Sequence, residues 1–267
     1  MSDNQSPPEH RSVSQVKQWE QCPHSYYLAR IVKAWERPAA WLDHGKADHA
    51  AIEAWEKSGR TMTREQAHDV FREEYAKGIN ALCADTPNFN FWFSSGKYRG
   101  EADVERRYGI GLEMVDRYIA YAEKASHEAI WITPDGTPAI ELGLDVDLDG
   151  VRVKGFIDQV ITTGDDGELR VRDVKTGASP GETFQLKTYA VMIEETYKVP
   201  VHVGDYWMGK TGKPTKHPYD LTEMTRSEVV DRFHAADEGI RAENWEPKPD
   251  PDVCRRCPVA TACAFSA

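Results

Sequence analysis

The sequence has no long hydrophobic run, no excess of positive charge and few cysteines. No apolar stretch approaches the roughly 20 residues that a membrane-spanning helix needs, and the polar segment Met1–Arg11 lacks the apolar core of a signal peptide. We therefore expect a cytoplasmic protein with no membrane partner. The 267 residues are enough to bury a full core, and we expect one domain spanning 1–267.

Acidic residues outnumber basic ones by 44 to 33, which gives a formal net charge of -11. A charge of this sign opposes bulk electrostatic attraction to nucleic acid. Two local basic clusters could still contact a phosphate backbone: Lys97, Arg99, Arg106 and Arg107 form one, and Lys210, Lys213 and Lys216 form the other. The net charge alone therefore does not exclude a nucleic-acid substrate.

The cysteines are too few and too unevenly placed for a disulfide framework in a reducing cytoplasm. Cys254, Cys257 and Cys263 have the spacing Cys-x2-Cys-x5-Cys, which suits a metal ion or an iron–sulfur cluster, and Cys22 is the natural fourth ligand. Four thiolates hold either tetrahedral zinc or a 4Fe-4S cluster, and the spacing does not separate the two. Cys83 is left over, as a small buried hydrophobic residue.

Helical patterns occupy the first half of the chain and recur near its end. We expect helices from Ser12 or Ser14 to about residue 30, interrupted at Cys22, and then over 42–57, from Thr63, and over about 101–126, 182–197 and 225–244. Residues 50–126 form the expected helical block and 225–267 the C-terminal helix with its cysteines. An aromatic loop between Cys83 and Arg99 either packs onto the body or serves as a platform for stacking bases.

The segment 130–210 is rich in β-strand patterns. Residues 139–149 alternate apolar and polar side chains, Asp149-Gly150 is a two-residue hairpin turn, and 165–167 forms the next turn. Three consecutive antiparallel strands result, followed by a helix and a further strand over 201–208. Side chains in a strand alternate faces, so Asp173 and Lys175 share one face.

Two aspartates and a lysine then converge if Asp158 reaches the same patch from the neighbouring strand. Such a group suits a hard divalent cation and a reacting phosphate. Asp-x-Lys alone is a weak signal, because it usually marks a solvated ion pair.

The combination of motifs is more specific. It resembles the RecB-like branch of the PD-(D/E)XK nuclease superfamily, and within it the iron–sulfur exonucleases similar to the CRISPR-associated RecB-like nucleases and the AddB nuclease domain. The residues that carry the resemblance are Ser12–Ser14, Cys22-Pro23, Tyr26-Tyr27, Gly45–His49, Gly155–Asp158, Asp173–Gly177, Gln185–Tyr189 and the three C-terminal cysteines.

The resemblance implies an α/β fold with a restriction-endonuclease-like core, in which helices flank a central mixed sheet. A helical insertion and an iron–sulfur cluster that joins the N- and C-terminal segments complete the expected fold. It implies that a 4Fe-4S cluster is bound by Cys22, Cys254, Cys257 and Cys263. It also implies that Mg²⁺ or Mn²⁺ is bound by His49, Asp158, Asp173 and the carbonyl of Val174.

Catalytic roles follow for the remaining motif residues. Lys175 would orient or activate the attacking water, and Gln185 and Tyr189 would position the lysine or the DNA backbone. Asp173 stands where the family usually has Glu or Asp. The implied activity is metal-dependent hydrolysis of DNA, exonucleolytic on single-stranded ends, in recombination, repair or phage DNA processing.

Several alternatives stay open. The chain could trim spacer precursors for CRISPR adaptation with an integrase partner, or bind DNA ends without cutting them. Other protein partners in recombination are also compatible with the sequence, and zinc could replace iron at the cysteines. Glu141 projects from the polar face of its strand, where it could belong to the metal site or lie on a solvated face.

Overall fold

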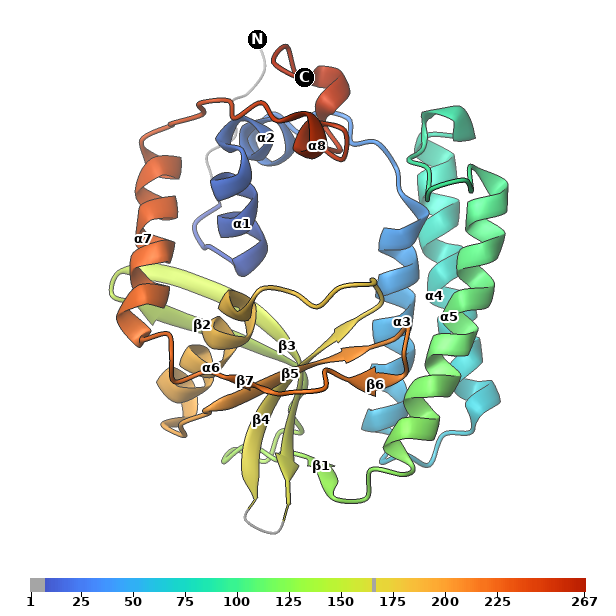
Figure 1. Cartoon of the computed structure of the whole chain (residues 1–267), viewed down its shortest axis with the longest axis vertical. Coiled ribbons are helices and arrows are strands. Elements are labelled where there is room, and N and C mark those ends of the chain that lie inside the picture. Colours follow the sequence, from blue (N-terminus) through green and yellow to red (C-terminus); the bar gives the residue numbers. More distant parts are fainter. Residues whose placement is uncertain (1–7, 165–166) are drawn as a thin grey trace. The chain divides into compact units, whose positions relative to one another are not determined.

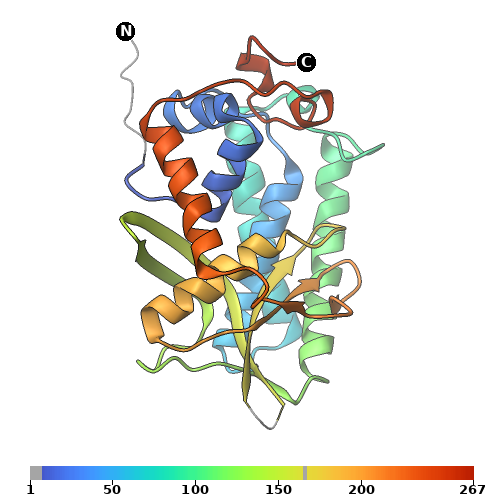
Figure 2. The same cartoon turned by 60° about the vertical axis from the view of Figure 1, so that its left-hand side comes forward.

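The computed structural model describes residues 8–164 and 167–267, which form two compact units. The first unit comprises Met1–Arg37, of which residues 8–37 are described, together with Asp145–Gly155 and Met224–Ala267. The second unit comprises Pro38–Leu144 and Phe156–Glu223. Figures 1 and 2 show the chain in two views, and each unit is taken by itself below.

Helices from both ends of the chain build the first unit. The structure has α1 (Val13–Gln21), α2 (Pro23–Tyr26), the π-helical turn η1 (Tyr27–Ile31), α7 (Arg226–Arg241), α8 (Pro251–Cys254) and η3 (Ala260–Ala262). Ser12 caps α1, and the predicted interruption at Cys22 is confirmed, because Cys22 ends α1 and Pro23 begins α2. Thr225 and Glu228 form the predicted capping box of α7, which ends at Arg241, three residues earlier than expected.

Close packing between α1 and α7 holds the first unit together. A Cβ atom at Gly239 would lie 2.1 Å from the Trp19 ring, so only glycine lets the two helices approach this closely. Arg11, at 1% exposure, forms a 2.7 Å ion pair with Asp237 on α7. The residues directly before α1 are thus part of the packed unit.

Three helices form one layer of the second unit: α3 (Ala40–Lys57), α4 (Arg64–Asp85) and α5 (Glu101–Ala122). They lie side by side in both views (Figures 1 and 2), around a core of small and aromatic residues. The predicted capping box between Thr63 and Gln66 starts α4. Gly111 allows α5 to lie against Phe71, because a Cβ there would come 2.0 Å from the ring. The layer is therefore closely packed.

The aromatic loop between α4 and α5 is partly buried. Trp92 is 3% exposed and donates its indole N–H to the Thr86 carbonyl, and Phe89 packs against its ring at 5.0 Å. Phe91, by contrast, is 57% exposed. Packing onto the helical layer accounts for Trp92 and Phe89, which follows the first of the two interpretations of this loop.

The sheet has the order β1-β3-β4-β5-β6, with β2 paired to β3 and β7 paired to β5. Its strands are β1 (Glu128–Ile130), β2 (Ile140–Leu148), β3 (Val151–Thr163), β4 (Glu168–Lys175), β5 (Val203–Met208), β6 (Lys213–Pro214) and β7 (Tyr219–Asp220). Strand β2 alternates buried and more exposed residues as predicted. The predicted turn at 165–167 falls partly on residues 165–166, which lie outside the described residues.

Strands β4 and β5 are parallel, and helix α6 (Thr183–Tyr197) connects them, which makes the sheet mixed. On β4, Val174 points into the core of the helical layer, whereas Asp173 and Lys175 contact Gln185 of α6. The predicted alternation of faces along this strand is confirmed. An α/β unit with a mixed sheet between helices fits the expected core.

In residues 8–164 and 167–267, each helix is too short or too polar to cross a bilayer.

Candidate active site

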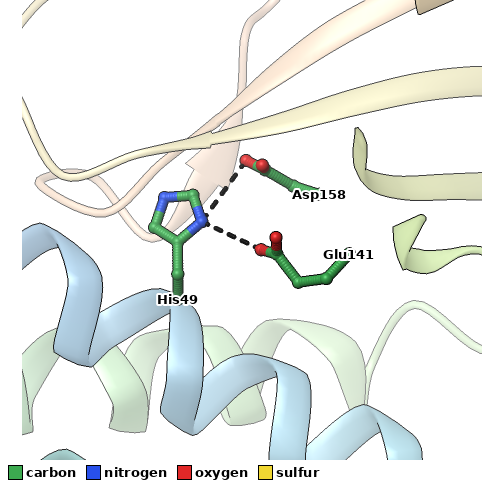
Figure 3. A group of neighbouring side chains, drawn as sticks. All are labelled: His49, Glu141 and Asp158. Atoms are coloured by element: carbon green, nitrogen blue, oxygen red, sulfur yellow. Dashed lines mark hydrogen bonds and ion pairs between the residues drawn. The ribbon is translucent and has the colours of Figure 1, made fainter. Parts of the chain in front are cut away.

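Three ligand-type side chains from three elements of the second unit meet beside β4. His49 of α3, Glu141 of β2 and Asp158 of β3 have ligand atoms within 4.8 Å of one another (Figure 3). The Nδ1 atom of His49 lies 3.3 Å from a Glu141 carboxylate oxygen and 3.6 Å from one of Asp158. Nitrogen and carboxylate oxygens at this spacing form a donor set for a divalent metal.

The backbone conformation around His49, Asp158 and Glu141 orients their side chains toward one another. His49 sits in the middle of α3, and its Nε2 lies 3.0 Å from the Val174 carbonyl oxygen on β4. Asp158 accepts a 2.6 Å hydrogen bond from the backbone N–H of Val174. Glu141 has a φ of 46°, a left-handed conformation that a glutamate rarely adopts. Strain of this kind concentrates at functional sites, because the surrounding fold must hold it in place.

Burial and mutual charge shift the acidities within this group. Burial raises the pKa of Asp158 to about 7, helped by the nearby Asp173 and Glu141 carboxylates and opposed by His49. For His49, burial alone lowers the pKa, but Asp158, Glu141 and Asp173 outweigh it and raise the pKa to about 9. Three carboxyl groups thus lie near one imidazolium and the Lys175 ammonium, and a divalent cation would neutralise the negative charge that remains when Asp158 ionises.

A second polar network lies on the α6 side of β4. Lys175 Nζ is 2.7 Å from a carboxylate oxygen of Asp173 and donates a 3.2 Å hydrogen bond to the Gln185 side-chain carbonyl. The Gln185 amide in turn donates to Asp173 at 2.5 Å and to the Tyr189 hydroxyl at 3.0 Å. Burial raises the pKa of Tyr189, so its hydroxyl keeps its proton at neutral pH. The lysine is thereby held in one position.

The structure brings together most of the residues singled out in the sequence, and it adds one. Glu141, whose role the sequence left open, lies in the His49 and Asp158 group. Asp173 pairs with Lys175 and Gln185, and the carbonyl of Val174 faces His49. A usable signal for Glu141 was present in the sequence, because counting back from the two-residue turn at 149–150 places it opposite Asp158.

We call His49, Glu141 and Asp158 the metal-ligand group. An open groove of about 550 Å³ runs along α3 to this group. Trp41, Lys46, His49, Glu53, Glu141 and Thr176 are among the residues that line it. Trp41 packs against Phe93 of the aromatic loop, with ring centres 5.5 Å apart, while Lys46 is exposed. His49 and Glu141 are therefore reachable from outside by an extended substrate.

A basic groove of about 390 Å³ lies where α5 ends and β5 turns into β6. Lys124 and His127 line one part of it, and Lys213 lines another. The turn between β5 and β6 starts beside Lys175, because the N–H of Gly209 donates to the Lys175 carbonyl oxygen at 2.9 Å. Positive charge thus borders the carboxyl ends of β4 and β5, although the whole chain is acidic.

In the first unit, all four cysteines of the predicted cluster line one cavity of about 150 Å³. They are Cys22, Cys254, Cys257 and Cys263, and Cys257 also lies 3.5 Å from the Ser25 hydroxyl. In the described part of the chain, no three of their sulfurs gather within 4.8 Å of one another. Their place around one cavity is compatible with either of the two groups that four thiolates hold, zinc or a 4Fe-4S cluster.

The fifth cysteine lies elsewhere. Cys83 packs, partly buried, against the core of the helical layer.

Comparisons with known proteins give matches over most of the chain. A family model described as the PD-(D/E)XK nuclease superfamily matches residues 10–264. The Gene 69 protein of Mycobacterium phage D29 is 50% identical over 261 residues, covering 95% of this chain and 96% of that protein. The Gene 69 protein of Mycobacterium phage L5 is 49% identical over 280 residues, covering 95% of each. A solved structure, "Crystal structure of SSO0001", matches 62% of this chain and 76% of that chain at 16% identity and a TM-score of 0.37.

Proposed function

The chain belongs to the PD-(D/E)XK nuclease superfamily, and from that premise we propose that it is a metal-dependent DNA exonuclease acting on single-stranded ends. The observation that carries the proposal is the pair of neighbouring networks beside β4. One network is the metal-ligand group of His49, Glu141 and Asp158, and the other is the Asp173 and Lys175 pair. The phage origin of the relatives favours a role in the recombination, repair or processing of phage DNA.

The donor set fits Mg²⁺ or Mn²⁺. Carboxylate oxygens suit both ions, and the imidazole of His49 admits manganese more readily than an all-oxygen site would. Asp158 and Glu141 supply the charge, and Asp173 and the Val174 carbonyl complete the proposed ligand set. When bound, the metal supplies a Lewis acid and a water molecule of lowered pKa.

Lys175 serves the hydrolysis itself. The water oxygen gives up a proton to solvent as it forms a bond to phosphorus, and the ester bond to the sugar oxygen breaks as that oxygen takes up a proton from solvent. Negative charge builds on the phosphoryl oxygens in the transition state. The Lys175 ammonium, held by Asp173 and Gln185, stabilises that charge and orients the water. Because the Gln185 amide donates to Tyr189, the Tyr189 hydroxyl keeps its own proton available for the DNA backbone.

The four cysteines are proposed to hold a 4Fe-4S cluster. They come from both ends of the chain yet line one cavity, and three C-terminal cysteines with one distant N-terminal cysteine resemble the arrangement in the iron–sulfur nucleases. The role of such a cluster is structural, because it would join the segment around Cys22 to the segment around Cys257.

Digestion of DNA labelled at either end tests the proposed activity. Purified protein with Mg²⁺ or Mn²⁺ should shorten single strands progressively from an end, and Asp173→Ala should not. Intact single- and double-stranded DNA after incubation with the metal-loaded protein would contradict the proposal. Such a protein would fit the non-cutting DNA-end-binding alternative.

A further inference from the structure

Phe156 is the most exposed large hydrophobic side chain among the described residues, at 66%. It precedes Asp158 by two positions on β3, and residues two apart in a strand share a face about 6.6 Å apart. An apolar ring therefore stands in solvent directly beside the metal-ligand group.

The neighbouring strand is shaped to receive the ring. Counting back from the turn at 149–150 places Gly143 opposite Phe156, and Glu141 opposite Asp158. A Cβ at Gly143 would lie 3.1 Å from the Phe156 Cε1 atom, closer than most real contacts, so the ring rests on bare β2 backbone. One side of the ring is thus supported, and the two strands that carry the acids also carry the aromatic surface.

We propose that Phe156 is a stacking surface for the unpaired base of a nucleotide next to the scissile phosphate, an inference that rests on the proposed nuclease function. A divalent cation at His49, Glu141 and Asp158 would bind the scissile phosphate and so bring the neighbouring nucleotides to this face of the sheet. Every base has a π-face, so stacking on an aromatic ring tolerates any sequence. A base in a duplex is already stacked and paired, so the ring selects single-stranded ends.

The stack would also set where cleavage falls along the strand. A base stacked on Phe156 fixes the position of the DNA strand relative to the metal-ligand group. The ring supplies no proton and no charge, so Phe156 is a positioning residue. Loss of the Phe156 ring should therefore raise KM and let cleavage occur at several neighbouring phosphodiester bonds, while metal binding stays intact.

A double-mutant cycle between the ring and the base tests the inference. The protein partner is Phe156→Ala, and the DNA partner is a single strand with one abasic nucleotide next to the cleaved bond. Each change alone should lower kcat/KM by about 5- to 150-fold, the usual range for one stacked base. Together they should cost little more than either alone, because both remove the same contact. Fully multiplied losses, or no loss with Phe156→Ala, would overturn the inference.

A binding measurement keeps the test independent of the chemistry. With Ca²⁺ in place of Mg²⁺, the fluorescence of 2-aminopurine at the same nucleotide should be quenched by the parent and by Phe156→Trp, but not by Phe156→Ala or Phe156→Leu. Ile132→Ala, which removes another exposed hydrophobic side chain of the second unit, should quench as the parent does. Equal quenching by all variants overturns the stacking role. Quenching without any cleavage by the parent would instead count against the nuclease function alone.

Discussion

Protons and metal should compete for the same side chains. The pKa of His49 is raised from 6.5 to about 9, and that of Asp158 from 3.8 to about 7. Both shifts favour the protonated form in the folded state. Without metal, the stability gained from His49 is fully present below pH 6.5 and is lost as the pH rises through about 9. The stability gained from Asp158 is fully present below about pH 3.8 and is lost as the pH rises through about 7.

The metal-bound state must release these protons, so its affinity should rise with pH. At every pH between 6 and 8, binding of one metal ion displaces one proton from His49. The affinity for the metal therefore rises about tenfold per pH unit, or about 100-fold over this range. Asp158 adds up to roughly another tenfold, mostly below pH 7. At a fixed metal concentration well above the dissociation constant, a 100-fold change is worth about 2.7 kcal/mol of stability.

Thermal unfolding and calorimetry with Mn²⁺ measure this competition. The melting temperature should fall from pH 6 to pH 8 without metal, and the increment that Mn²⁺ adds should grow over the same range. Titrations in buffers with different ionisation enthalpies should count one to two protons released per metal at pH 6. His49→Gln should remove most of the pH dependence, whereas His68→Gln, a histidine paired with Asp116 on another surface, should not. Metal affinity that is flat from pH 6 to 8 would refute the reasoning.

Gln185→Ala should lower the cleavage rate by about 10- to 100-fold with a much smaller change in metal affinity, because it frees Lys175 and one Asp173 oxygen without removing a ligand; a loss of Mn²⁺ binding as large as the loss of rate would contradict this. Neutralising Lys124 and Lys213 should reduce the slope of log affinity for single-stranded DNA against log salt by about 1.4. A matched Lys57→Gln/Lys77→Gln variant, which removes lysines paired within their own helices, should keep the slope. Cys257→Ser should lose iron and sulfide from anaerobically purified protein and increase proteolysis around α8, and a full complement of zinc in the parent would contradict the iron assignment.

Local signals predicted much of this fold. The capping boxes at Thr63 and Thr225 and the proline after Cys22 are short-range interactions, so they placed helix starts within a residue. The alternation along β4 likewise predicted that Asp173 and Lys175 share a face. Both depend only on residues a few positions apart.

Long-range pairing was harder to predict. The parallel register of β4 and β5 joins residues about 33 apart, and no local pattern encodes that partner. Arg11 belongs to the packed first unit because of an ion pair with Asp237, far away in sequence, and the polar composition of the N-terminal segment does not predict this contact. Helix α5 ends at Ala122, four residues before the expected end at Ser126, where its last carbonyls bond to a turn.

The metal-ligand group likewise depends on long-range contacts that local sequence patterns do not predict. His49 and Asp158 came from a resemblance that spans the chain, whereas Glu141 required the hairpin register and a backbone conformation with positive φ. Alternation alone could say only that Glu141 faces away from the core. The strained backbone that turns its carboxylate toward His49 is a property of the folded site.

The most direct test of the central claim measures Mn²⁺ binding and single-turnover cleavage of a single strand by three proteins side by side. The parent should bind the metal and cut. Asp158→Ala should lose both, while Lys175→Ala should bind Mn²⁺ as the parent does and cut at least about 100-fold more slowly. If Lys175→Ala cuts at the parental rate, or if Asp158→Ala binds Mn²⁺ as tightly as the parent, the assignment of metal binding to Asp158 and of water activation to Lys175 is wrong.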